Sequence, residues 1–305
     1  MDFKDLTKGL LFSLSILSIM VIIVMQILFE EATTRSEKMH KKLCTQLNIS
    51  CILHCASYLF MYIKINKSNN PLCHIEGILN IGFVLSTILF TVSISIILYY
   101  SFSSSEESYF RKHFSTIARV FSIISWCVPI VYIVTYYINC IMKDGFGSAM
   151  KIYQNGTCWL HEQYKGMIIY YMVLMLIGLS VGTLYTILLI IAVFKEIAQS
   201  HDYQQMYKIT KFLPLFINVV TFAPFIINMV MIAFAKKEDP VFGLICECLE
   251  CLSGVTFAVG YELNKVSCSN KKRKSSSNKI SFVDLSTGKE FTLINSTDEN
   301  VSVVE

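Results

Sequence analysis

Residues 74–100 read HIEGILNIGFVLSTILFTVSISIILYY, and Glu76 is the only side chain of this run that is charged at neutral pH. A hydrocarbon core about 30 Å thick is crossed by about 20 helical residues, because each residue advances an α-helix by about 1.5 Å. The run is therefore long enough to cross a bilayer. Six more apolar runs accompany it, which gives the set 9–29, 43–63, 74–100, 117–141, 167–194, 212–234 and 241–261. The sequence predicts an all-α membrane protein, a bundle of seven transmembrane helices.

The amino-acid composition supports this prediction. Hydrophobic residues make up 54% of the chain and charged residues only 16%, whereas soluble proteins average about 25% charged residues. Backbone groups without hydrogen-bond partners are costly in lipid, so only helices and closed barrels cross it. The alternation over about ten residues that marks barrel strands is absent, which leaves helices.

Several function classes lack the residues that they need. The net charge of +4 is too small for a nucleic-acid binder, which gathers basic residues on one face. The eleven cysteines include no pair of CxxC units of the kind that binds zinc. His54 is the only histidine deep within a span and no span contains Asp, so a metal-dependent membrane hydrolase would have no ligands. We expect a protein that is not an enzyme, with no metal, no cofactor and no nucleic-acid partner.

The distribution of Lys and Arg predicts the orientation, because these residues concentrate on the cytoplasmic side. The basic cluster KKRK at 271–274 follows the last apolar run, so we expect the carboxyl terminus inside and the amino terminus outside. Glycosylation sequons at Asn66 and Asn155 fall in two loops that this orientation places outside. We therefore expect a multi-pass protein of the plasma membrane.

The runs divide the chain into three regions, which are a short extracellular amino terminus (1–8), the seven-helix transmembrane domain (9–261) and a cytoplasmic tail (262–305). The tail is basic at first and then rich in Ser and Thr, a composition typical of disorder. Its basic part is expected to lie on anionic membrane lipid. Cys268 beside this part is a candidate for reversible palmitoylation.

Two cysteines differ from the others in their position. Cys73 precedes the third run at its outer end, and Cys158 lies beside Trp159 in the longest loop, 142–166. In the expected orientation both face an oxidising compartment, where disulfides persist. A bridge between them would hold the long outer loop across the mouth of the bundle.

Polar side chains recur at helical spacing within the spans. Glu76 and Asn80 are four residues apart on the third span, and Glu247 and Glu250 are three residues apart on the seventh. Polar groups at membrane depth face the bundle interior or a wet cavity. We expect an external ligand cavity bordered by these residues and one loop aromatic: Glu76, Asn80, Trp159, Glu247 and Glu250.

The same polar groups have alternative roles. Glu247 and Glu250 could share a bound cation, or they could pair with Lys236 or Lys237 just outside the span. Stripes of Ser and Thr more often join helices by hydrogen bonds than bind ligands.

Other residues suit a moving part of the bundle. His54 lies midway along the second span, where it either hydrogen-bonds a neighbouring helix or changes its charge with pH. Pro214 and Pro224 remove backbone hydrogen bonds from the sixth span, which permits a kink. Gly254 and Tyr261 share a face of the seventh span with its two acids. We expect activation or hinge roles for these five residues.

Seven helices, an external amino terminus and a bridge from the third helix to the second outer loop resemble a G-protein-coupled receptor. Short motifs narrow the resemblance to the cyclic-AMP chemoattractant receptor family: CHIEG at 73–77, ILYY at 97–100, SWCVP at 125–129, CW at 158–159, LP at 213–214, FAP at 222–224, and SG at 253–254 through YELN at 261–264. The Cys-Trp pair and His54 are also similar to secretin and adhesion receptors. The chain departs from the latter in having no acid at the inner end of the third helix, and it has no Asp-Arg-Tyr element of the rhodopsin class.

This resemblance implies that an extracellular ligand drives nucleotide exchange on a heterotrimeric G protein. The sixth helix would swing at its inner end and open a crevice bordered by basic residues of two inner loops: Arg111, Lys112, Lys208 and Lys211. No Lys or Arg lies in the outer halves of the spans to bind the phosphate of cyclic AMP, so the acids favour a neutral or cationic ligand. The alternative function is a multi-pass transporter or channel, although the two halves of the chain share no pattern.

Overall fold

The computed structural model describes residues 3–28, 35–63, 71–103, 113–145, 149–153, 157–200, 222–228, 230–231, 240–277, 279–283, 290–294 and 303–304. The chain divides into two compact units, Met1–Gly260 and Tyr261–Glu305. The first unit contains the helical bundle and the side chains of the candidate site.

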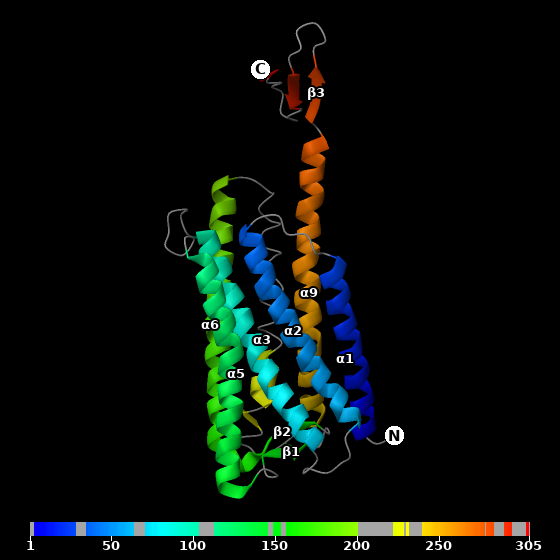
Figure 1. The fold of residues 1–305 in the computed structure, drawn as a ribbon, viewed down its shortest axis with the longest axis vertical. Helices are drawn as coiled ribbons and strands as arrows, with labels where there is room; N and C mark the ends of the chain where they lie inside the picture. Colours follow the sequence, from blue (N-terminus) through cyan, green and yellow to red (C-terminus); the bar gives the residue numbers. More distant parts are fainter. Residues whose placement is uncertain are drawn as a thin grey trace. The chain divides into compact units, whose positions relative to one another are not determined.

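The first unit is built from long helices that lie side by side (Figure 1). They are α1 (Phe3–Leu28), α2 (Arg35–Ile63), α3 (Pro71–Ser103), α5 (Phe114–Asp144), α6 (Lys165–Ser200) and the part of α9 (Pro240–Ser277) that precedes Tyr261. Helix α3 is central, because α2, α5 and α6 all pack against it. In the most apolar part of α3 72% of the residues are buried, against 22% in α1 and in α5.

Five helices of the described residues are long and apolar enough to cross a membrane: Asp5–Ile27, Lys41–Phe60, Pro71–Tyr100, Phe114–Asp144 and Glu162–Ala192. They coincide with the first five predicted runs, although the first helix begins at Phe3, inside the region expected to be a short amino terminus. The seventh run, 241–261, lies in α9. Most of the sixth run, 212–234, lies outside the described residues, but 222–228 are helical.

The outer surface of the bundle is apolar. On α5 the side chains of Ile123, Val131 and Ile138 are each more than half exposed, and similar residues cover α1 and α6. Such a surface would be unfavourable in water, whereas a lipid environment matches it. The chain is therefore an all-α protein embedded in a membrane. This agrees with the fold class that the sequence predicts.

A short β-hairpin covers one end of the bundle (Figure 1). Its strands β1 (Met150–Ile152) and β2 (Cys158–Leu160) pair antiparallel, with Lys151 opposite Trp159. A 3-10 turn, η2 (Glu162–Tyr164), connects β2 to α6, and both strands contact α3. The hairpin belongs to the segment that the sequence places in the longest outer loop.

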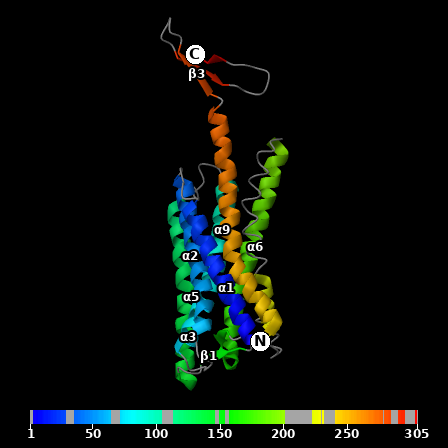
Figure 2. The same cartoon turned by 90° about the vertical axis from the view of Figure 1, so that its right-hand side faces the viewer.

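Two glycines allow close contacts between helices. A Cβ atom on Gly178 of α6 would lie 2.9 Å from Cγ2 of Ile88 on α3. A Cβ atom on Gly254 of α9 would lie 2.7 Å from the Cβ of Cys51 on α2 and 2.9 Å from Cδ1 of Ile22 on α1. Helix α9 therefore packs tightly against α1 and α2, and Figure 2 shows α1 alongside it.

The second unit, Tyr261–Glu305, contains the segment in which the composition predicts disorder. Helix α9 extends through it to Ser277, and three strands follow: β3 (Lys279–Val283), β4 (Glu290–Ile294) and β5 (Val303–Val304). They form an antiparallel sheet in the order β3-β4-β5, with Phe282 opposite Phe291.

Candidate functional site

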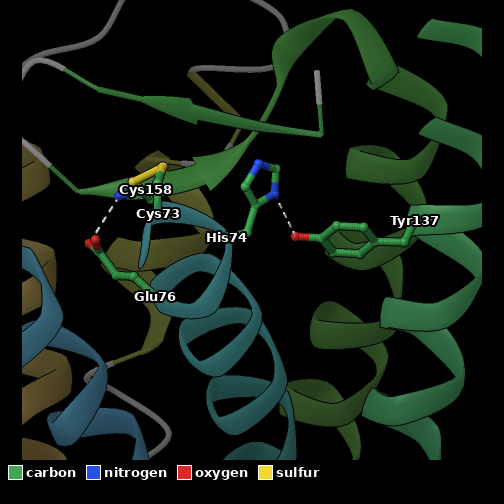
Figure 3. Close-up of a disulfide and its surroundings, with 5 residues drawn as sticks. All are labelled: Cys73, His74, Glu76, Tyr137 and Cys158. Atoms are coloured by element: carbon green, nitrogen blue, oxygen red, sulfur yellow. Dashed lines mark hydrogen bonds between the residues drawn. A yellow bond between two sulfur atoms is a disulfide. The ribbon is translucent and has the colours of Figure 1, made fainter. Parts of the chain in front are cut away.

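The predicted disulfide is present at the hairpin end of the bundle (Figure 3). Cys73 in the first turn of α3 and Cys158 at the start of β2 form a bond with an S–S distance of 2.04 Å and a Cα–Cα distance of 5.4 Å. Both residues are fully buried. The bridge closes a loop of 85 residues in sequence and attaches the hairpin to the central helix, as the sequence predicts.

Glu76 holds the same strand in place from one turn further along α3. Its Oε1 accepts a hydrogen bond of 3.0 Å from the backbone N–H of Cys158, and its side chain is fully buried (Figure 3). A hydrogen bond to an ionised acceptor is stronger than one between neutral groups. The residue that we expect at a ligand cavity therefore has a structural contact with the hairpin.

A second contact near the disulfide joins α3 to α5. His74 Nδ1 lies 3.0 Å from the hydroxyl oxygen of Tyr137, and both side chains are buried (Figure 3). Sequence reasoning missed this pair, because the two residues are 63 positions apart and neither has a spacing that links it to the other.

Tyrosine hydroxyls fasten the hairpin to α5 and to itself. The hydroxyl of Tyr136 donates to the carbonyl of Ala149 and accepts from the backbone N–H of His161 at 3.1 Å. Within the hairpin, the Tyr153 hydroxyl donates to the carbonyl of Leu160 at 2.9 Å. The Ala149 carbonyl and the His161 N–H are also joined by a backbone hydrogen bond of 3.3 Å, so the Tyr136 hydroxyl adds a side-chain contact to groups that the hairpin already pairs.

His161 ends the hairpin and begins η2. Its Nδ1 accepts a hydrogen bond of 3.2 Å from the backbone N–H of Gln163, which requires an unprotonated Nδ1. Burial lowers the pKa of the His161 imidazole, and the nearby Lys151 ammonium lowers it further. Lys151 in turn forms a half-exposed ion pair of 2.9 Å with Glu162.

The hairpin also sends an aromatic side chain into the bundle. Trp159 is 6% exposed, and its indole makes edge contacts with the rings of Tyr171 on α6, at 5.8 Å between centroids, and Phe225, at 5.5 Å. The indole Nε1 is buried, and within the described part of the chain it has no hydrogen-bond partner. The same holds for Oδ1 of Asn80, which lies on α3. Two residues predicted for the ligand cavity thus each carry a buried polar atom with unused hydrogen-bonding capacity.

A buried cluster of polar side chains joins α2 to α9. The Glu250 Oε2 accepts a hydrogen bond of 3.3 Å from the Tyr58 hydroxyl and lies 3.4 Å from the His54 Nε2. All three side chains are less than 5% exposed. Sequence reasoning identified His54 and Glu250 separately but neither their pairing nor Tyr58. The spacing of four residues from His54 to Tyr58, which places both on one helix face, is the signal that could have added the tyrosine.

The remaining predicted residues of α9 lie close to this cluster. Glu247 is one turn before Glu250 and is also buried, at 8% exposed. Gly254 is one turn after Glu250 and leaves no room for a Cβ atom against Cys51 of α2. Among the described residues, no group of three or more His, Cys, Asp or Glu side chains could hold a metal ion.

Several predicted residues lie outside the described residues, namely Asn66, Arg111, Lys112, Asn155, Lys208, Lys211 and Pro214, together with the alternative partners Lys236 and Lys237. Pro224 is half-buried within the helical residues 222–228. No protein-family model matches the chain, and no curated protein sequence matches it either.

Proposed function

We propose that the chain is a G-protein-coupled receptor of the plasma membrane, in which seven transmembrane helices convert binding of an extracellular ligand into activation of a heterotrimeric G protein. The observation that supports this best is the attachment of the hairpin to α3. Cys73 and Glu76 both bind Cys158, so a covalent bond and a hydrogen bond hold the loop across one end of the bundle. A disulfide persists in an oxidising compartment, which supports an external location for that end.

The ligand would bind between this hairpin and the buried acids of α9. Trp159 of the hairpin offers an indole N–H donor, and Asn80 offers an amide oxygen acceptor. Glu247 and Glu250 add buried carboxyl groups on α9, which suit a neutral or cationic ligand better than an anionic one. A small number of polar groups among aromatic side chains is typical of small-molecule sites.

The response would be transmitted to the opposite end of the bundle. A ligand that binds one conformation more tightly shifts the population towards it, and the sixth helix with Pro214 and Pro224 is the proposed moving element. Arg111, Lys112, Lys208 and Lys211 of the inner loops are the proposed contacts with the G protein.

A ligand screen in cells that report nucleotide exchange on several Gα classes tests the proposal. We expect at least one small-molecule ligand to stimulate exchange, and Cys158→Ser to raise the half-maximal concentration by about tenfold, equivalent to about 1.4 kcal/mol. The matched control is Cys127→Ser, because Cys127 is an exposed free cysteine of α5. Both variants are compared at equal surface expression.

The opposite result would be a lack of exchange on every Gα class together with solute flux in proteoliposomes. That outcome would favour the transporter or channel.

A further inference from the structure

His54 and Glu250 lie well inside helices α2 and α9, and Tyr58 lies one turn nearer the end of α2. Helix α2 ends at Ile63, nine residues after His54, and α9 begins at Pro240, ten residues before Glu250. At about 1.5 Å per residue, the two ionisable side chains lie about 14–15 Å from these helix ends, which is about half the thickness of the hydrocarbon core. Ionisable groups at this depth are costly unless they are paired, and they mark functional sites more often than structural ones.

The charge of the His54–Glu250 pair depends on how many protons it holds. With one proton the pair is neutral overall, either as imidazolium and carboxylate or as imidazole and carboxylic acid. With two protons it carries one positive charge, and with none it carries one negative charge. The neutral, singly protonated pair is therefore the state that a low-dielectric surrounding favours.

The hydrogen bonds of the pair are incomplete. The distance of 3.4 Å between the His54 Nε2 and the Glu250 Oε2 is long for a charge-assisted hydrogen bond, which is about 2.7–2.9 Å. Glu250 Oε1 and His54 Nδ1 are both buried, and among the described residues neither has a hydrogen-bond partner. The Tyr58 hydroxyl donates to Oε2 of the same carboxyl group. The carboxyl group thus keeps a free oxygen atom that can accept a proton.

Among the described residues, the titratable groups that surround the pair are carboxyl groups, thiols and phenols rather than Lys or Arg. On α9 these groups are Glu247, Cys246 and Cys251, and α2 adds Cys55 beside Tyr58. Tyr171 of α6 lies within electrostatic range of Glu250, and α1 presents Ser15, which contacts Cys251 at 3.6 Å. Among these groups His54 is the one that can become a cation, so it determines the charge balance of Glu250.

We propose that His54 and Glu250 form a buried proton-binding site between α2 and α9. The pair holds one proton near neutral pH and takes up a second from the aqueous phase when the medium is acidified. In this step the added proton forms an O–H bond on the Glu250 carboxylate, so imidazolium and carboxylate become imidazolium and carboxylic acid. The attraction between α2 and α9 is lost, and the helices separate more readily. This proposal depends on membrane embedding and not on the coupling to a G protein.

Infrared difference spectroscopy on the purified full chain in lipid nanodiscs tests the site. Spectra are compared between about pH 8 and about pH 5, the interval over which histidine chemistry operates. We expect acidification to add a C=O stretching band of a protonated carboxylic acid. Glu250→Gln should remove the band, and Tyr58→Phe should shift its frequency, because the hydroxyl that donates to Oε2 is lost.

The variant His54→Gln tests whether the protonation of Glu250 depends on His54 or only on the burial of its carboxyl group. Without the imidazolium, Glu250 should stay protonated throughout the pH interval, so the absolute band remains and the difference band disappears. The matched control is Glu76→Gln, because Glu76 is an equally buried carboxyl group that has a backbone N–H partner. This variant should leave the Glu250-dependent band unchanged.

Two results would overturn the proposal. One is a wild-type chain that gains no carboxylic-acid band on acidification, and the other is a band that persists in Glu250→Gln. Should Glu250→Gln fail to fold, the wild-type chain labelled with ¹³C at the glutamate carboxyl groups gives the decisive comparison with Tyr58→Phe, and an unshifted band would count against the site. Neither the infrared band nor its shift involves a G protein. The proton-site proposal can therefore fail while the receptor proposal stands.

Discussion

At Glu76 one carboxylate stabilises the backbone of a segment that is 82 residues away in sequence. Glu76→Leu removes the buried acceptor of the Cys158 N–H, which should lower the free energy of unfolding by about 1–3 kcal/mol. Glu76→Gln keeps a neutral acceptor and should cost less. Thermal unfolding of the purified chain measures both.

The control for Glu76 is Glu162→Gln, because the Lys151–Glu162 ion pair is half-exposed and such pairs contribute at most about 1 kcal/mol. Equal melting temperatures for Glu76→Leu and Glu162→Gln would contradict the structural role of Glu76.

His161 makes the hairpin sensitive to acid. Burial and Lys151 lower the pKa of His161 in the folded hairpin, so the opened hairpin binds a proton at higher pH than the closed one. The stabilisation is complete above the ordinary histidine pKa of about 6.5 and is lost progressively as the pH falls below it. Hydrogen exchange at the Gln163 N–H, corrected for intrinsic rate, should rise on acidification.

The variant His161→Asn tests the origin of this pH dependence. Asn is a good capping residue without a titratable group, so exchange at Gln163 should become independent of pH in the variant. A pH dependence that survives His161→Asn would assign it to another group.

At the scale of the elements, Gly254 sets the distance between α9 and α2. Gly254→Ala would place a Cβ atom 2.7 Å from the Cβ of Cys51, which cannot move without moving its backbone. We expect a loss of about 1–3 kcal/mol in unfolding free energy. Gly9→Ala is the matched control, because nothing lies within 4 Å of the added atom and Ala should stabilise α1 by about 1 kcal/mol. Melting temperatures that fall equally for both variants would contradict the close packing.

The elements differ in how far the sequence predicts them. The spans at Asp5–Ile27 and Pro71–Tyr100 follow from length and hydropathy, because lipid imposes both on any crossing helix. The pairing of His54 with Glu250 could not be predicted. The spacing of polar residues indicates which face of a helix is buried, but not which neighbouring helix packs against that face. The hairpin at 150–160 was also missed, because its two strands have three residues each and rest on contacts with α3 and α5.

At the scale of the whole molecule, the disulfide and the polar cluster have different roles. The disulfide attaches the hairpin to α3, and the polar cluster joins α2 to α9. The Cys73–Cys158 bridge was predictable from position alone, because two cysteines at the same end of the bundle are brought together by the fold. The ligand-cavity residues were predicted as one group, but the structure separates Glu76, which holds the hairpin, from Glu250, which pairs with His54. Composition cannot make that distinction, because both are acids within apolar runs.

The two proposals connect at this scale. The hairpin closes one end of the bundle, and the proton site lies about half a membrane thickness further along α2 and α9. A ligand beneath the hairpin and a proton at Glu250 would both change the packing of α9, so their effects should be linked thermodynamically.

An odd number of crossings is the central requirement of the receptor proposal, because it places the ligand end and the G-protein end on opposite sides of the plasma membrane. Epitope tags at the two ends of the chain, probed with antibodies on intact and on permeabilised cells, measure this directly. For a receptor with seven crossings, we expect the amino-terminal tag to be labelled on intact cells and the carboxyl-terminal tag only after permeabilisation. Labelling of both tags under the same condition would mean an even number of crossings and would rule out the proposed receptor.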